Sequence, residues 1–323
     1  MDVIALGELL IDFTPHGHSE QGQPLFERNP GGAPANVLAA LAKLGRETAF
    51  IGTVGNDAFG RYLADTLADA GINVDQLQYT DDAQTTLAFV HLDESGDRSF
   101  TFYRKPGADQ LLDAKAIDLD LVGGAKLFHF GSISMTHEPS RTATLAAAAA
   151  ARSQGVPVSF DPNLRMSLWE DAEQAKAAIL EGMAFADVAK VSEEELVFLT
   201  GTSELNGGSA LLMEKYGIKL LLVTLGPEGS FCRAVDADGS ILTARHAGFR
   251  VEAVDTTGAG DAFLGGVLHR LLDEMHPANP VWTEEKLTRL LAFANAMGAL
   301  TATGKGAIPS LPTLEQAERF AGL

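Results

Sequence analysis

The stretch DTTGAGDAFLGG, residues 255–266, is the most informative part of the chain, because it places glycines, hydroxyls and a carboxylate where a strand would pass into a helix. Gly258 and Gly260 allow a tight turn with bare backbone N–H groups. A helix that begins near Ala259 would add the positive end of its dipole at the same point. The turn is therefore suited to an anion, and Asp261 beside it is placed to take a proton from a nucleophile that attacks phosphorus.

Other glycine-rich motifs do not match this stretch. It lacks both the Gly-x-Gly-x-x-Gly spacing of a dinucleotide fold and the Gly-Lys-Ser/Thr ending of a P-loop. A second motif, GGAPAN at residues 31–36, brings backbone close to a ligand and offers the amide of Asn36 as both donor and acceptor. Asp12, after the first strand, can accept two hydroxyl hydrogens at once. The two motifs together predict a kinase that acts on a polyol.

Short apolar runs alternate with amphipathic stretches along most of the chain. The runs read as strands at residues 3–6, 49–51, 127–130, 156–160, 187–191 and 220–224, and the stretches read as helices at 34–44, 59–70 and 139–153. This alternation predicts an α/β fold with a mostly parallel central sheet flanked by helices on both faces. Ligands of such sheets gather at the carboxyl ends of the strands.

Two segments break the alternation and read as antiparallel strands. They are residues 8–28 and 84–105, and the second reads as a hairpin of Thr85–Leu92 and Arg98–Arg104 turned by residues 93–97. Together they predict a small β-sheet lid over the active-site edge. An exposed thin sheet needs cover, which predicts a homodimer through the lid sheet.

Size and charge limit the possible partners. The 323 residues are 46% hydrophobic and predict one large α/β domain over 1–323 with the lid as an appendage. A net charge of −19 argues against nucleic acid or an anionic membrane as a partner and favours a small molecule. Cys232 is the only cysteine, which fits a reducing cytoplasm. The acidic N-terminus and the lack of an apolar run of about 18 residues also predict a cytoplasmic location.

The paired motifs at 31–45 and 255–266 resemble those of the phosphofructokinase-B family of carbohydrate kinases, which have the ribokinase-like fold. The agreement spans nearly the whole chain. Segments between and after the motifs resemble the fructokinases of plants and bacteria: FHFGSIS at 128, DPNLR at 161, KVSEEEL at 190, LLLVTLG at 220 and KGAIPSLP at 305.

The resemblance implies a role for each matching position. It makes Asp261 the catalytic base and the backbone of Thr257, Gly258, Ala259 and Gly260 the anion hole. The implied sugar-facing residues are Asp12, Gly31, Gly32, Asn36, Phe102, Arg104, Asn163 and Arg165. The implied nucleotide site consists of Lys190, Ser192, Glu195, Thr224, Gly226, Gly229 and Asn295. A potassium ion is implied near Asp255, Thr257, Thr301, Gly304, Gly306 and Ser310.

One position departs from the family pattern. The usual Asn-x-x-Glu is replaced by Ser192-Glu193-Glu194-Glu195, so the Mg²⁺-phosphate role of residue 192 does not transfer directly. Mg²⁺ is expected to arrive with ATP.

The implied reaction is ATP-dependent phosphorylation of the 6-hydroxyl of D-fructose. Other possibilities stay open. Arg104, Lys105 and Arg165 could pair with the carboxylate of 2-keto-3-deoxygluconate, or the chain could be another sugar kinase of the same family. It could also be a catalytically inactive sugar sensor.

Overall fold

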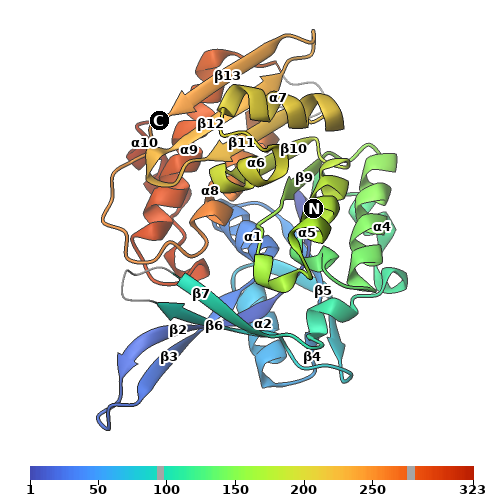
Figure 1. The fold of residues 1–323 in the computed structure, drawn as a ribbon, viewed down its shortest axis with the longest axis vertical. Helices are drawn as coiled ribbons and strands as arrows, with labels where there is room; N and C mark the ends of the chain where they lie inside the picture. The colour runs from blue at the N-terminus through green and yellow to red at the C-terminus, as the bar shows by residue number, and fades with distance from the viewer. Residues whose placement is uncertain (93–97, 275–280) are drawn as a thin grey trace.

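The computed structural model describes residues 1–92, 98–274 and 281–323, and the turn predicted at 93–97 lies outside them. The described residues form a large sheet between layers of helices and a small sheet that projects from one end (Figure 1). The predicted strands and helices are present, with ends shifted by a few residues. The predicted fold class is thereby confirmed.

The large sheet has nine strands in the described part of the chain, in the order β13-β12-β11-β10-β9-β8-β1-β4-β5. The pairs from β11 to β5 are parallel, and β12 and β13 are antiparallel at one edge. The strands are β1 Val3–Leu6, β4 Thr48–Gly55, β5 Ile72–Thr80, β8 Leu127–Gly131, β9 Val158–Asp161, β10 Val188–Ser192, β11 Leu220–Thr224, β12 Ser230–Val235 and β13 Ile241–His246.

Helices cover both faces of this sheet, and each face has its own hydrophobic core. Strand β1 shows why, because successive side chains of a strand point to opposite faces: Val3 and Ala5 belong to one core, and Ile4 and Leu6 to the other. The helices are α1 Ala33–Lys43, α2 Ala58–Asp69, α3 Leu119–Gly123, α4 Ser140–Ser153, α5 Ala172–Met183, α6 Glu193–Thr200, α7 Leu205–Tyr216, α8 Ala259–Glu274, α9 Glu284–Ala302 and α10 Leu314–Ala321.

The small sheet is formed by the two segments that break the alternation. Its order is β3-β2-β6-β7, with β2 Leu10–His18, β3 Pro24–Gly31, β6 Leu87–Leu92 and β7 Arg98–Tyr103. The strands pair antiparallel within β2–β3 and within β6–β7, but β2 and β6 run parallel. This parallel pair joins the two predicted segments into one sheet. Its movement as a lid remains a prediction.

Strand order reverses next to β1, and this reversal positions the site. From β1 the chain reaches β4 and β5 on one side, and later returns to β8 on the other side. Ligands of open α/β sheets bind outside the carboxyl ends of the strands at such a point. Glu8, Asn163 and Ser192 all lie at or just beyond the carboxyl ends of β1, β9 and β10.

Candidate active site

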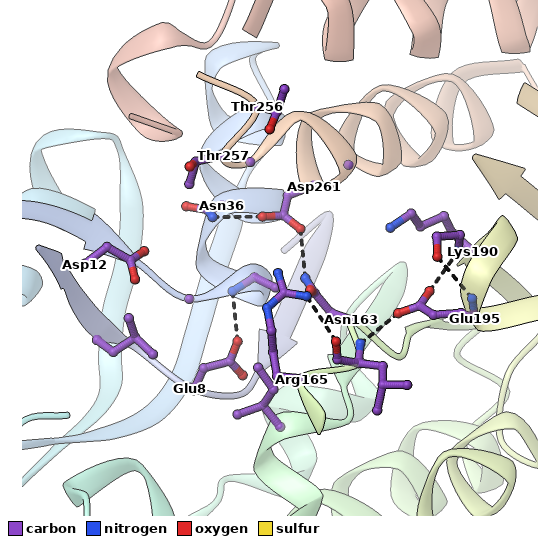
Figure 2. Close-up of a pocket in the computed structure, with 18 of the residues that line it drawn as sticks. Glu8, Asp12, Asn36, Asn163, Arg165, Lys190, Glu195, Thr256, Thr257 and Asp261 are labelled. Atoms are coloured by element: carbon purple, nitrogen blue, oxygen red, sulfur yellow. Dashed lines mark hydrogen bonds between the residues drawn. The ribbon is translucent and has the colours of Figure 1, made fainter. Parts of the chain in front are cut away.

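A cavity of about 680 Å³ lies at this edge of the large sheet, with residues of the small sheet in its wall. Its lining comes from segments that are far apart in the sequence, as Figure 2 shows for the labelled side chains. The lining includes these predicted site residues: Asp12, Gly32, Asn36, Phe102, Asn163, Arg165, Lys190, Ser192, Glu195, Thr257, Gly258, Gly260 and Asp261.

Asp261 lies in the first turn of α8 and contacts two segments that are distant in the sequence. Its Oδ2 accepts a hydrogen bond from Nδ2 of Asn36 at 2.8 Å, and its Oδ1 accepts one from Nδ2 of Asn163 at 3.3 Å. Figure 2 shows these two amides approaching the carboxylate from different sides. The polyol motif and the anion motif therefore meet in one cavity, as the sequence predicts.

The environment of Asp261 raises its pKa to about 6. Burial contributes most, since the side chain is almost inaccessible to water, and the nearby charge of Asp161 adds to it. The hydrogen bond from Asn36 and the charges of Lys190 and Arg165 act in the opposite direction. A carboxylate with a pKa slightly below neutral is mostly ionised at pH 7 yet basic enough to take a proton from an alcohol.

The turn before α8 requires glycine. Gly258 has φ of 75°, and a Cβ there would lie 2.3 Å from Cβ of Ala307. A Cβ on Gly260 would lie 3.1 Å from Nζ of Lys190, which places this ammonium beside the turn. Lys190 also pairs with Asp161 at 2.9 Å. The start of α8 thus combines backbone N–H groups, the helix dipole and a cation, which suits an anion.

The small sheet contributes one wall of the cavity. Side chains alternate along its strands, so Leu10 and Asp12 of β2 and Phe102 of β7 line the cavity. Burial raises the pKa of Asp12 to about 7, opposed by the charge of Arg165. Gly32 at the start of α1 has φ of 121°, and a Cβ there would lie 2.3 Å from the backbone oxygen of Glu8. This close approach accounts for glycine at position 32, and a Cβ on Gly31 would likewise meet the carboxylate of Asp12.

Ser192 and Glu195 form a capping box at the start of α6. The Ser192 hydroxyl accepts a hydrogen bond from the backbone N–H of Glu195 at 3.1 Å, and Glu195 Oε2 accepts one from the N–H of Ser192 at 2.8 Å. Glu195 Oε1 accepts a third from the N–H of Leu164 at 2.7 Å. Glu195 therefore holds the loop that carries Asn163 and Arg165. The substitution of Ser192 for the usual Asn leaves a normal helix cap.

Some predicted residues do not line the cavity. Arg104 is buried elsewhere: it pairs with Asp109 at 2.6 Å and donates hydrogen bonds to the Thr136 hydroxyl and the Ile133 carbonyl. Asn295 donates to the Ser230 hydroxyl at 2.9 Å. The other predicted sugar, nucleotide and anion-hole residues outside the lining are Gly31, Thr224, Gly226, Gly229 and Ala259. Their roles stay predictions.

The predicted potassium residues lie on two loops that the structure brings together. Asp255 Oδ1 accepts a hydrogen bond from the N–H of Thr257 at 2.9 Å, and its Oδ2 accepts one from the N–H of Gly306 at 3.0 Å. The N–H groups of Val254 and Asp255 also bind the carbonyl of Ala302. Within 1–92, 98–274 and 281–323, no group of three or more His, Cys, Asp or Glu residues is arranged for a metal ion.

Two carboxylates of the site are not among the predicted residues. Glu8 lines the cavity just beyond β1. Asp161 ends β9, and its Oδ1 accepts a hydrogen bond from the N–H of Asn163 at 3.2 Å. Their positions carry a signal, because both follow or end a strand at the carboxyl edge of the sheet. Asp161 is also the first residue of the DPNLR segment.

The architecture and the cavity define the class of the protein. A large mostly parallel sheet, a small second sheet and a buried acid beside a glycine turn are the features of a ribokinase-like kinase. The family model for pfkB family carbohydrate kinases matches residues 1–314, and the chain belongs to this family. The family resemblance predicted from the motifs is confirmed.

Known relatives are similar over most of their length. The chain is 48% identical over 316 residues to the probable chloroplastic fructokinase-6 of Arabidopsis thaliana, covering 97% of this chain and 80% of that protein. It is 46% identical to fructokinase-1 of Zea mays, covering 96% and 94%.

Solved structures agree with this comparison. The fructokinase of Xylella fastidiosa with bound ATP superposes with a TM-score of 0.87 at 34% identity, covering 99% of this chain and 98% of that one. A double mutant of the fructokinase of Vibrio cholerae O395, in its fructose, ADP and potassium ion bound form, gives 0.87 at 37% identity with the same coverage.

Proposed function

We propose that the protein transfers the γ-phosphoryl group of ATP to the 6-hydroxyl of D-fructose. The observation that carries the proposal is the contact between Asn36 and Asp261, because it places a polyol-binding amide and a general base in one cavity. The fructokinases of plants and bacteria at 34–48% identity support fructose as the acceptor.

In the proposed mechanism Asp261 accepts the proton of the sugar hydroxyl as its oxygen attacks phosphorus in line with the leaving group. The N–H groups at the start of α8 stabilise the charge that develops on the transferred group. Lys190, beside Gly260, adds positive charge there. Closure of the small sheet would bring Asp12 and Phe102 onto the sugar and exclude water, which would otherwise compete as acceptor.

Cations are part of the proposal. Mg²⁺ that accompanies ATP would neutralise phosphate charge and be held by phosphate oxygens and water. The loops at 255–257 and 301–310 are the proposed potassium site, because hydrogen bonds of Asp255 and of the Ala302 carbonyl join them and Ala307 packs against Gly258 of the anion turn. The potassium ion in the Vibrio cholerae structure supports this part.

A homodimer through the small sheet is also proposed. The face opposite the cavity carries Phe13, Phe26, Phe89 and Tyr103, with Phe89 in ring contact with the other three. Phe26 and Tyr103 are exposed. Phe13 and Phe89 are half-buried beneath them. A partly exposed aromatic cluster of this kind is typical of an interaction surface, and a second copy would cover it.

The cytoplasm stays the proposed location, although the Arabidopsis relative is named as chloroplastic. In the described residues, no helix combines the length and the apolar character that crossing a membrane requires.

A coupled ADP-release assay tests the function. Fructose, 2-keto-3-deoxygluconate, ribose and fructose 1-phosphate are compared side by side with Mg-ATP, and fructose is expected to give the highest kcat/KM. A preference for the sugar acid would replace fructose as substrate. Sugar binding without ADP release from any of them would support the sugar sensor.

A further inference from the structure

Glu8 occupies a position in the cavity that the mechanism above does not use. It lies just beyond β1, and its side chain is almost fully buried, with 1% of the residue exposed. Its Oε1 accepts a hydrogen bond from the N–H of Ala33, the first residue of α1, at 2.9 Å. Its Oε2 has no hydrogen-bond partner among the residues that the structure describes.

A buried carboxylate oxygen without a partner is costly, so its persistence at a cavity indicates a ligand. Asn36 provides a second such acceptor, because its Oδ1 also lacks a partner in the described part of the chain while its Nδ2 binds Asp261. Both residues line the same cavity at the start of α1. Two unpartnered acceptors on one wall match two hydroxyl groups of one molecule.

We propose that Glu8 is a sugar-binding residue whose Oε2 forms a hydrogen bond with a hydroxyl of the acceptor, and that its charge selects neutral polyols over sugar acids. The inference rests on the proposed sugar kinase function. In this proposal Glu8 contacts one face of the sugar, and Asp261 and Asn163 lie beside the hydroxyl that reacts.

The position of Glu8 favours this selection. Its carboxylate lines the cavity with those of Asp12 and Asp261, and the cations of the lining are Arg165 and Lys190. A sugar carboxylate bound against Glu8 would meet a like charge at that point, which weakens its binding. Burial raises the pKa of Glu8 to about 7, so the charged acceptor form predominates above this pH, and the test below is run at about pH 8.5.

A purely structural role gives a different expectation. If Glu8 only anchors α1 through Ala33, any side chain that keeps an acceptor at the Oε1 position would preserve function. Glutamine keeps this oxygen and replaces Oε2 by an NH₂ group that can only donate. Glu8→Gln therefore separates the sugar contact from the support of the helix.

The test measures KM for fructose, KM for ATP, kcat and thermal stability of Glu8→Gln. The control is Glu47→Gln, which removes the same charge at an exposed position near the opposite end of β1. For Glu8→Gln we expect KM for fructose to rise about tenfold or more, as for a lost charged hydrogen bond, with KM for ATP within about twofold. We also expect its preference for fructose over the sugar acid 2-keto-3-deoxygluconate, measured as the ratio of their kcat/KM values, to decrease. Glu47→Gln should match wild type in every measurement.

An unchanged KM for fructose in a folded Glu8→Gln protein would overturn the inference alone. A wild-type protein that released no ADP with any sugar would overturn the proposed function and the inference with it. If Glu8→Gln does not fold, Glu8→Asp takes its place, because it keeps the charge but withdraws it by one methylene. KM for fructose must then rise while KM for ATP holds, and equal rises in both would refute the sugar contact.

Discussion

Asp261→Asn tests the central residue of the site through both rate and stability. Asparagine has nearly the same shape but cannot accept a proton at neutral pH. If Asp261 is the general base, turnover should fall by about 10²-fold or more, because general-base catalysis contributes about 10²–10⁴. KM for fructose should change little, since Asn36 and Asn163 still face the site.

The raised pKa of Asp261 also makes a prediction about stability. A carboxyl group whose pKa is raised in the folded state binds its proton more tightly there than in the unfolded chain. Its stabilising contribution is therefore present below the unfolded pKa of 3.8 and is lost as the pH rises through about 6. At 1.36 kcal/mol per pKa unit, the wild type should lose about 2 kcal/mol relative to Asp261→Asn between about pH 4.5 and pH 7.5.

Two measurements on the same pair of proteins check this reasoning. Coupled ADP release gives kcat and KM, and urea unfolding at several pH values gives the free energy of unfolding. The difference between the proteins cancels the contribution of Glu8, whereas the pKa of Asp12 is raised in part by the charge of Asp261 and falls when that charge is removed. Near-normal turnover of Asp261→Asn would refute the catalytic role, and a difference independent of pH would refute the raised pKa.

Two further predictions concern the cation loops and the aromatic face. Asp255→Asn leaves one acceptor for the two N–H groups of Thr257 and Gly306, so the potassium concentration for half-maximal rate should rise about tenfold. ADP release is measured as KCl is titrated, with NaCl as the control salt. A variant with the same KCl titration as the wild type would contradict the assignment of these loops to potassium. Phe26→Asp places a charge on the exposed face of the small sheet and should convert dimers to monomers; light scattering measures the mass, and a dimer of unchanged stability would remove this face from the interface.

Much of the architecture is predictable because its signals are local. Residues 3–6 and 220–224 are short apolar runs between turns, and each forms a strand of the parallel sheet. Gly45, Gly71 and Gly155 have positive φ just after helices, as the predicted helix ends require. The parallel pairing of β2 with β6 is not predictable, since it pairs residues as distant in the sequence as Ile11 and Leu87 with no hairpin turn to join the two strands.

The site is predictable in part for a related reason. Asp261 and Asn36 stand out because each lies in a motif whose chemistry is local. The resemblance assigns Arg104 to the sugar. In the folded chain its guanidinium instead pairs with Asp109 and donates a hydrogen bond to the Ile133 carbonyl. Glu8 escapes sequence reasoning because a single glutamate after a strand carries no motif, although its two oxygens have different surroundings.

The alternating elements, the glycine turns and the two motifs can be read from the sequence, because periodicity, positive φ and helix starts depend on neighbouring residues. Which polar groups face the cavity, and which pair with each other, can be read only from the folded chain. The partner of each polar group depends on how distant segments pack. In the folded chain Arg104 forms an ion pair with Asp109, and Nδ2 of Asn36 lies 2.8 Å from Oδ2 of Asp261. Oε2 of Glu8 is buried without a hydrogen-bond partner among the described residues.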